Sequence, residues 1–370
     1  MADVYLLTLA ISIAIGVIAT LLLLGLSRTE RFLSLFHVRG PMERPRWGGA
    51  VFLAAFALTP YLASAVSPHA AEFFTPKSDD FLGLLAAVSL VFVVGFFDDI
   101  KLTSPGLRTV VVMIAAAAVY ASGYRIDDVG LPWGASLDLG WLGFFATIGW
   151  IWLITNAFNI IDGRDGVAAG VAVLAAVTLA VVSANSDHPT VALLLVALAG
   201  AGLGFLPFNL PPASAYVGDS GAYVLGFILG TLSIRGATGP ADEVFIAVPL
   251  VALGFPIFDI GLAFVRRLLE RRHPLIGDTD HIHHRLEVAG AGPRGLLVII
   301  YGLAAVFSGS AILLHYVDRF YVEAAVFAAL VATVSIMLLR LGYLVTIWNS
   351  HSVVWLRQRV VAPAEHSSRD

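Results

Sequence analysis

Three short segments of the sequence place carboxylates where a long apolar run ends. In the first, F-F-D-D-I-K over residues 96–101, Asp98 and Asp99 are adjacent. Two ionised carboxylates side by side repel each other, so the pair suits a divalent cation or a proton transfer, although a solvated acidic pair at a helix end has the same pattern. Lys101 and Arg108 follow at spacings that bring cations to a phosphate, unless these charges only set membrane topology.

The second segment, N-A-F-N-I-I-D-G-R-D-G over residues 156–166, concentrates Asn and Asp beside glycines. Asn159, Asp162 and Asp165 supply oxygen ligands on a turn that glycine permits. Such ligands suit a hard cation like Mg²⁺, which keeps waters and substrate phosphates in its shell. Capping of the next helix by Asp162 or Asp165 is the alternative, but the density of these side chains over a short stretch favours a functional site.

The third segment, F-N-L-P-P-A-S-A-Y-V-G-D-S-G over residues 208–221, leads into another apolar run. Asp219 occupies a position typical of a helix N-cap, which by itself would explain it. Upstream, Asn209 precedes Pro211 and Pro212, which stiffen the approach to the helix. Tyr216 is an aromatic side chain that can stack on a nucleotide base or lie in the aromatic belt of a membrane interface. The combination favours a ligand-binding loop.

Basic side chains collect in the longest polar segment, residues 266–294. Arginine forks bind phosphate oxygens in bidentate fashion, so this composition suits a diphosphate. Arginines that only set topology and a zinc site made of histidines are the alternatives. Zinc is disfavoured because the chain has no cysteine and the histidine spacing matches no helical ligand pair. The residues concerned are Arg266, Arg267, Arg271, Arg272, His281, His283, His284 and Arg285.

These polar segments stand out because the rest of the chain is apolar. Of 370 residues, 58% are hydrophobic and 13% are charged, whereas a typical soluble domain carries about 25% charged residues. This composition excludes an ordinary soluble enzyme and favours one polytopic membrane domain. The lack of cysteine excludes disulfides, iron–sulfur clusters and cysteine-ligated zinc. A net charge of −4 provides no basic field for nucleic acid.

Apolar runs of about 20 residues predict an all-α polytopic membrane protein with about eleven transmembrane helices. We expect a single transmembrane domain over residues 1–361 and a disordered tail at 362–370. The first run is too long for a signal peptide and has no preceding Lys or Arg, so we expect it to remain as a span. Asp259, inside the ninth run, needs a partner such as Arg or Asn on a neighbouring span, or a water-filled cleft. The runs lie near residues 4–26, 48–66, 81–97, 107–123, 142–158, 166–184, 190–207, 220–235, 244–265, 295–316 and 322–347.

The distribution of positive charge predicts the orientation of these helices. If successive runs alternate across the membrane, seventeen of the 22 Lys and Arg residues fall on one side. The positive-inside rule makes that side cytoplasmic, with the N-terminus outside and the C-terminus inside. On the outside, residues 124–141 alternate polar and apolar around a Pro-Trp-Gly turn and predict a short periplasmic β-hairpin. The cytoplasmic side contains every polar segment above, in loops 27–47, 98–106, 159–165, 208–219 and 266–294.

Together the motifs resemble the polyprenyl-phosphate N-acetylhexosamine-1-phosphate transferase superfamily, over nearly the whole chain from Arg44 to Leu286. N-A-F-N-I-I-D-G and H-I-H-H-R-L are most similar to the branch that starts O-antigen, enterobacterial common antigen, teichoic acid or arabinogalactan linkers. The resemblance implies transfer of N-acetylhexosamine 1-phosphate from a UDP-sugar, with UDP-GlcNAc the expected donor, to undecaprenyl phosphate, with release of UMP. It also implies Mg²⁺ or Mn²⁺ as cofactor and a location in the inner (plasma) membrane with a cytoplasmic active site, and it allows a homodimer.

The resemblance further implies roles for individual residues. The metal ligands would be Asp219 and, second, Asn159. The residues that deprotonate or orient the lipid phosphate would be Asp98 and Asp99. The nucleotide site would contain Asn209, Tyr216, Asp162 and Asp165. The phosphate and sugar groups would contact Arg108, His281, His283, His284 and Arg285, with Lys101, Arg44 and Arg46 as weaker candidates.

Two positions depart from the pattern of the superfamily, and two other functions stay open. Arg164 occupies the middle of D-G-R-D-G, which is usually apolar, and R-P-R-W-G-G has arginines where some branches have Thr or Ile. A phospho-N-acetylmuramoyl-pentapeptide transferase shares the motifs, although its last loop usually carries a different His-rich sequence. A secondary transporter would place its acids near the membrane midplane, whereas these acids cluster at the cytoplasmic ends of the predicted helices.

Overall fold

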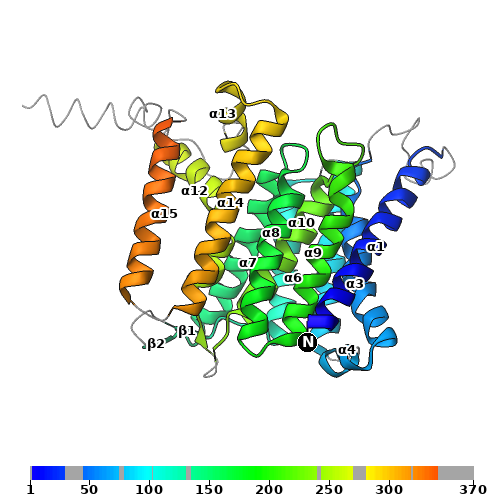
Figure 1. The fold of residues 1–370 in the computed structure, drawn as a ribbon, viewed down its shortest axis with the longest axis horizontal. Coiled ribbons are helices and arrows are strands. Elements are labelled where there is room, and N and C mark those ends of the chain that lie inside the picture. The colour runs from blue at the N-terminus through cyan, green and yellow to red at the C-terminus, as the bar shows by residue number, and fades with distance from the viewer. Residues whose placement is uncertain are drawn as a thin grey trace, which may run out of the picture.

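Long apolar helices run side by side through the structure, and successive long helices point in opposite directions (Figure 1). The computed structural model describes residues 2–29, 45–74, 79–101, 103–130, 135–239, 243–269, 281–317 and 320–340. The helices are α1 (Ala2–Leu26), α3 (Gly48–Val66), α4 (Pro68–Phe73), α5 (Asp79–Ile100), α6 (Pro105–Ala121), α7 (Leu142–Ile161), α8 (Val167–Asn185), α9 (Pro189–Asn209), α10 (Gly218–Gly236), α11 (Ala247–Ala252), α12 (Gly254–Leu269), α13 (Ile282–Val288), α14 (Pro293–Tyr316) and α15 (Phe320–Arg340).

Eight of the described helices are long and apolar enough to cross a membrane, so the chain is an all-α, multi-pass membrane protein. They coincide with eight of the predicted runs. The other three runs correspond to α6, which has 17 residues, to α10, and to the pair α11 and α12. The eight helices are α1, α3, α5, α7, α8, α9, α14 and α15.

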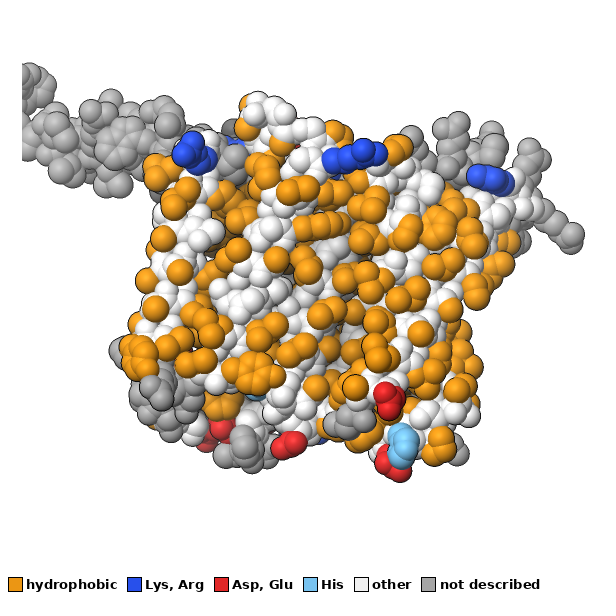
Figure 2. Space-filling model, viewed as in Figure 1, with side chains coloured by type: hydrophobic (Ala, Val, Ile, Leu, Met, Phe, Trp, Pro, Cys, Tyr) orange, Lys and Arg blue, Asp and Glu red, His pale blue; other side chains and the backbone are white. Residues whose placement is uncertain are grey.

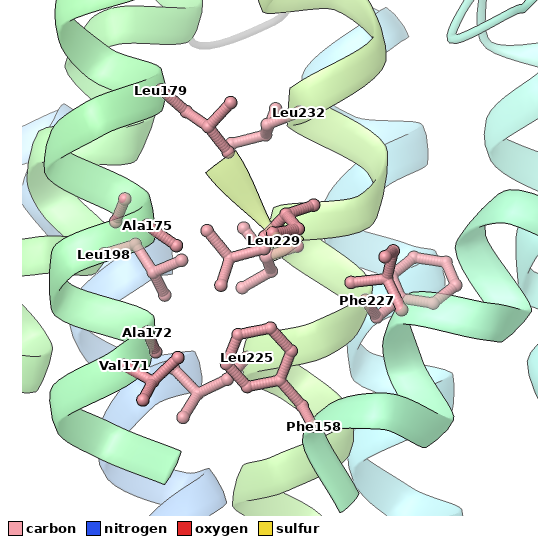
Figure 3. Close-up of a cluster of buried hydrophobic side chains, with 14 of the residues drawn as sticks. Phe158, Val171, Ala172, Ala175, Leu179, Leu198, Leu225, Phe227, Leu229 and Leu232 are labelled. Carbon is pink, nitrogen blue, oxygen red and sulfur yellow. The ribbon is translucent and has the colours of Figure 1, made fainter. Parts of the chain in front are cut away.

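Helix α10 lies in the middle of the bundle, which explains why its sequence is less apolar than that of its neighbours. It contacts α3, α5, α7, α8 and α9, and nearly all of its residues are buried. Figure 3 shows Leu225 and Leu232 of α10 among side chains of the surrounding helices, including Phe158 and Leu198. Because protein rather than lipid surrounds α10, it tolerates small and polar residues, and its first turn presents Asp219 to the neighbouring helices.

The predicted single run at 244–265 is wrong in one respect, because the structure divides it into α11 and α12 at Leu253. Pro256 has no backbone N–H and cannot donate to the carbonyl four residues earlier, which interrupts the helical ladder. The ring of Phe307 on α14 lies 2.4 Å from where a Cβ on Gly254 would be, so α14 packs directly against the break. Residues 341–347 of the last predicted run and the predicted tail at 362–370 lie outside the described residues.

Charged side chains occupy the two ends of the molecule and leave an apolar band between them (Figure 2). On the visible face, Lys and Arg lie at the end that carries α13, whereas Asp, Glu and His lie at the opposite end, where the N-terminus is marked in Figure 1. This arrangement is typical of a bundle whose middle contacts lipid and whose ends face water on opposite sides.

A small sheet lies at one side of the end of the bundle opposite α13 (Figure 1). Strand β1 (Asp128–Gly130) pairs antiparallel with β2 (Ser136–Asp138), inside the segment whose alternating pattern predicts a hairpin. Strand β3 (Glu243–Val244) adds to β1 in parallel, which gives the order β2-β1-β3. The third strand comes from the connection after α10, so a local sequence pattern does not reveal it.

Candidate active site

The polar ends of four helices meet at the end of the bundle that carries α13. Helices α5 and α7 finish there, and α6 and α10 begin there. Residues from the ends of α5, α7 and α9 and from the start of α10 line a cavity of about 260 Å³, to which three of the predicted segments contribute carboxylates. Its lining consists of Arg46, Asp99, Asn159, Asp162, Gly163, Arg164, Asp165, Asn209, Tyr216, Gly218 and Asp219.

Asp99 joins the end of α5 to the beginning of α10. Its Oδ1 accepts a hydrogen bond of 2.8 Å from the backbone N–H of Asp219, and its Oδ2 accepts one of 3.0 Å from that of Ser220. A carboxylate at a helix N-terminus satisfies free N–H groups and interacts favourably with the helix dipole. The cap of α10 is therefore supplied by another helix, and not by Asp219 as its N-cap-like position suggests.

Gly218 makes this junction sterically possible. Its φ of 70° lies in the left-handed region, and a Cβ at this position would be 1.9 Å from the carbonyl oxygen of Arg46. Only glycine fits both conditions without strain. The backbone of residues 45–48 also pairs with Tyr216, whose N–H donates to the Pro45 carbonyl at 2.9 Å and whose carbonyl accepts from the Gly48 N–H at 3.2 Å.

Asp98 is buried and fully engaged by residues that follow it in the chain. Its Oδ1 accepts from the backbone N–H and from the hydroxyl of Thr103, at 2.6 and 2.7 Å. Its Oδ2 accepts from Nη1 of Arg108 at 2.5 Å, across a side-chain ion pair. Arg108 thus reaches the acidic cluster from the first turn of α6. Lys101 is exposed and does not line the cavity.

The side chain of Asp219, on the first turn of α10, contacts residues of both α5 and α7. Nδ2 of Asn159, in the last turn of α7, donates to Oδ1 of Asp219 at 2.5 Å. The Asp219 carboxyl also faces Asp98 and Arg108. The two residues that the sequence predicts as metal ligands are therefore in direct contact.

Asp162 adds a further carboxyl group to this cluster, at the C-terminal end of α7. Burial, together with the negative charges of Asp219 and Asp99, raises the pKa of Asp162 well above its usual range. The backbone of Gly218 hydrogen-bonds this carboxyl and opposes the shift. The carboxyl groups of Asp99, Asp162 and Asp219 therefore lie close enough to repel one another, and a bound cation would offset this repulsion.

Oxygen donors of this kind fit Mg²⁺ or Mn²⁺. Among the described residues, no three carboxylate or imidazole side chains converge closely enough to hold a metal ion by themselves. A cation held by one carboxylate and one amide oxygen would complete its shell with water and substrate oxygens, which is how Mg²⁺ is usually bound. The donor set next to the cavity therefore fits the implied cofactor.

Asn209 and Asp165 brace two loops against each other. Oδ1 of Asn209 accepts from the Gly166 N–H at 3.1 Å, and its Nδ2 donates to the Ala215 carbonyl at 2.9 Å. Oδ2 of Asp165 accepts from the Ala213 N–H at 2.9 Å. The buried Asn209 amide is satisfied within the protein, so its first effect is to fix the shape of the cavity wall. Tyr216 and the exposed Arg46 lie on the same wall, and Arg44 lies outside the described residues.

The three histidines lie at the beginning of α13, next to the cavity. Asp259 of α12 holds this helix: its Oδ1 accepts from the Ile282 N–H at 2.9 Å, and its Oδ2 lies 3.1 Å from Nδ1 of His281. Within the described part of the chain, the contacts of the Asp259 carboxylate are thus with the start of α13, and not with the expected Arg or Asn on a neighbouring span. The His281 and His283 rings are stacked with centroids 5.7 Å apart, and those of His283 and His284 are 4.5 Å apart.

Burial lowers the pKa of His283 to about 4, so this ring is neutral at physiological pH. It contacts the loop after α7 directly, because a Cβ on Gly163 would lie 2.5 Å from its Nε2. Arg285 is half-buried on the same helix. The predicted histidine segment thus packs on the predicted D-G-R-D-G loop, although its residues do not line the 260 Å³ cavity.

A second, larger cavity of about 740 Å³ adjoins the first and shares Arg164, Asp165 and Tyr216 with it. Glu287, on the last turn of α13, also lines it. Sequence reasoning does not identify Glu287, Thr103 or Ser220 as site residues. Ser220 lies inside the third predicted segment and Thr103 lies two residues after the first, which is the available signal for them, whereas Glu287 gives no local signal.

Comparison with known proteins supports the resemblance. The sequence profile of glycosyl transferase family 4 matches residues 81–237, which extend from α5 to α10 and include every carboxylate of the cavity. The chain is 30% identical over 330 residues to a phospho-N-acetylmuramoyl-pentapeptide-transferase of Pelotomaculum thermopropionicum, a match that covers 81% of this chain and 94% of that protein.

Two other relatives are described as N-acetylglucosamine phosphotransferases. A probable undecaprenyl-phosphate N-acetylglucosaminyl 1-phosphate transferase of Bacillus subtilis is 34% identical over 226 residues, which cover 61% of this chain and 63% of that protein. A decaprenyl-phosphate N-acetylglucosaminephosphotransferase of Mycolicibacterium smegmatis is 32% identical over 291 residues, 70% of this chain and 68% of that protein. The chain belongs to glycosyl transferase family 4, within the polyprenyl-phosphate hexosamine-1-phosphate transferase superfamily.

Proposed function

We propose that the protein transfers N-acetylhexosamine 1-phosphate from a UDP-sugar to undecaprenyl phosphate and releases UMP. An oxygen of the lipid phosphate forms a bond to the β-phosphorus of the donor, while the bond from that phosphorus to UMP breaks. UDP-GlcNAc is the proposed donor because two of the relatives are named as transferases of N-acetylglucosamine phosphate. The reaction would be the first membrane step of a cell-envelope polysaccharide pathway.

The observation that carries the proposal is the convergence of Asp99, Asp162 and Asp219 on one small cavity, with Arg108 held beside them by Asp98. Phosphoryl transfer requires alignment and charge neutralisation more than covalent chemistry by the protein. A cluster of carboxylates next to an arginine, at the end of a membrane bundle, suits a reaction between a water-soluble diphosphate and a lipid phosphate. Mg²⁺ or Mn²⁺, bound by Asp219 and Asn159, would act as a Lewis acid that neutralises the donor diphosphate.

We assign the acceptor side to the end of α5. Arg108 is the side chain that binds the lipid phosphate in this proposal, and Asp98 positions it through their 2.5 Å contact. Asp98 and Asp99 would orient the phosphate or take its proton. Lys101, exposed at the end of the same helix, would add a cation at the lipid headgroup level.

We assign the donor side to the loops after α7 and α9. Asn209, Tyr216, Asp162 and Asp165 would hold the nucleoside, and all four line the 260 Å³ cavity. The sugar and its phosphate would contact α13 and the residue before it. That group consists of His281, His283, His284 and Arg285, together with Arg46, which lines the 260 Å³ cavity.

The proposed location is the inner membrane, with eleven crossings and the cavity on the cytoplasmic side. The end of the bundle that carries the cavity and α13 also carries the visible Lys and Arg residues (Figure 2), and the positive-inside rule assigns such an end to the cytoplasm. Cytoplasmic UDP-sugars would reach the cavity from that side. The short sheet of β1, β2 and β3 would then be periplasmic.

A second candidate function has its own support, because the match to the phospho-N-acetylmuramoyl-pentapeptide-transferase covers 94% of that relative. One assay distinguishes the two. The purified protein in detergent, with polyprenyl phosphate and Mg²⁺, is given UDP-GlcNAc, UDP-GalNAc or UDP-MurNAc-pentapeptide, and UMP release is measured. The proposal predicts UMP release from UDP-GlcNAc. Release from the pentapeptide donor alone would assign the second function, and no release from any donor would contradict both.

A further inference from the structure

Arg164 reaches from the loop after α7 to the last turn of α13. Its Nε and Nη2 donate to the two carboxylate oxygens of Glu287, with 2.6 Å between Nη2 and Oε2. Its Nη1 donates to the carbonyl of Gly163 in its own loop at 2.8 Å. The guanidinium therefore contacts both segments: Nε and Nη2 bind the helix, and Nη1 binds the loop. This bidentate geometry fixes the angle as well as the distance between the partners.

The same arginine selects a tautomer of His284. Nη2 of Arg164 lies 3.3 Å from Nδ1 of His284. A guanidinium nitrogen only donates, so this contact favours the tautomer with Nδ1 as acceptor and the proton on Nε2, whereas the carboxylate oxygen Oε2 of Glu287 lies farther from the same Nδ1, at 3.7 Å. His284 lines neither cavity, but its side chain is 36% exposed, so this tautomer presents an Nε2–H donor at the surface beside them, whereas the other tautomer would present an acceptor.

The ion pair contributes little to the free energy of global unfolding, because both side chains are more than a third exposed, at 38% and 37%, so its effect is on the local placement of α13. Pairs with this exposure typically contribute about 0–1 kcal/mol. The hydrogen bonds from Arg164 lower the pKa of Glu287, which keeps the pair ionised. Arg164 lines both cavities and Glu287 lines the larger one, so the pair forms part of the wall between them.

We propose that Arg164 and Glu287 form a latch that holds α13 on the loop after α7 and sets His284 as an Nε2–H donor to the sugar nucleotide. The proposal rests on the proposed function, because it names positioning residues for the same site. Arg164 and Glu287 act through His284 and not by contact with the reacting atoms. This gives a role to the arginine that departs from the usual apolar residue of the motif.

A charge-swap series tests the latch in activity. Arg164→Glu and Glu287→Arg should each lower kcat/KM for the UDP-sugar by about tenfold, and the double swap should restore it to within about threefold of wild type. UMP affinity of Glu287→Arg, measured by calorimetry on the same preparation, should stay within about twofold, because Glu287 does not line the cavity assigned to the nucleoside. Arg164→Glu should cause no further loss in a His284→Ala background. The matched control is Glu72→Arg, which reverses one charge of the exposed His69 and Glu72 pair on α4 and should leave kcat/KM unchanged.

A double swap as inactive as the single variants, or a single reversal with wild-type kcat/KM, would overturn the latch. A second measurement does not depend on turnover. In protein with ¹⁵N-labelled histidine, the His284 signals, assigned with His284→Gln, should report the Nε2–H tautomer in wild type and a mixture in Arg164→Ala. An Nδ1–H tautomer in the wild type would overturn the proposal. If the wild-type protein released no UMP from any donor, the proposed function would fail while the tautomer still decided the latch.

Discussion

Asp99 accepts a hydrogen bond of 2.8 Å from the backbone N–H of Asp219, and this contact fixes the first turn of α10 against the end of α5. The residue that we propose as a metal ligand is therefore positioned by a carboxylate from another helix. The same carboxylate closes the cavity on the α5 side. Charge and geometry in this site are consequently linked, since removing one acid moves another.

Asp99→Asn should weaken this junction. Asparagine has only one acceptor oxygen, so one of the two N–H groups at the start of α10 loses its partner. We expect a loss of about 1–2 kcal/mol in the free energy of unfolding, together with reduced turnover. Thermal unfolding in detergent measures the first effect. Asp80→Asn, an exposed change at the other end of α5, is the control, and equal melting temperatures for the two variants would argue against the cap.

Arg108→Ala should destabilise the protein because it leaves the buried Asp98 carboxylate without its cation. Breaking such a pair typically costs about 3 kcal/mol. The double variant Asp98→Asn with Arg108→Ala should recover most of this stability and remain inactive. A double variant that regained turnover would show that neither residue serves the lipid phosphate. Arg125→Ala, which removes an exposed arginine stacked on Tyr120, controls for loss of charge.

His283 should make stability depend on pH. Burial lowers its pKa to about 4 in the folded protein, whereas a free histidine has a pKa of about 6.5. Between these values the unfolded chain binds more protons than the folded one, so the free energy of unfolding falls as pH decreases through this window, by up to about 2–3 kcal/mol. Melting temperatures of wild type and His283→Gln from pH 7 to pH 4.5 test this. Parallel curves would contradict a buried neutral ring.

Asp259→Leu should release the start of α13. The carboxylate accepts from the Ile282 N–H at 2.9 Å, and leucine leaves that N–H and His281 without this partner. We expect lower UDP-sugar turnover with a smaller change in UMP affinity, because α13 lies on the sugar side in our proposal. Asp259→Asn keeps one acceptor oxygen, so its UDP-sugar turnover should lie between that of wild type and that of Asp259→Leu. A leucine variant with wild-type kcat/KM would show that α13 is held by other contacts.

The helices are predictable from the sequence because a membrane span needs a long apolar run, and such runs are visible without tertiary information. The break at Leu253 is less visible, since it depends on Pro256 and on the ring of Phe307 that packs from α14. Helix α10 is the instructive case. Its lower hydropathy reflects its central, protein-surrounded position, which local composition does not report.

The members of the site are also largely predictable, because alternation of spans brings Asp99, Asn159 and Asp219 to the same end of the bundle. Their pairing is not predictable in this way. That Asp98 engages Thr103 and Arg108 while Asp99 caps α10 follows from the register of α5 against its neighbours. The contact between Arg164 and Glu287 is likewise not predictable, because it joins segments that are far apart in the sequence.

The most direct test of the account is UMP release by Asp219→Ala. The purified wild-type protein should release UMP from UDP-GlcNAc only when polyprenyl phosphate and Mg²⁺ are both present. Asp219→Ala should lose at least about a hundredfold in rate, with a melting temperature close to that of wild type, and no Mg²⁺ concentration should restore it. Near wild-type turnover in this variant would contradict the proposed site, because the contact between Asn159 and Asp219 would then serve structure alone.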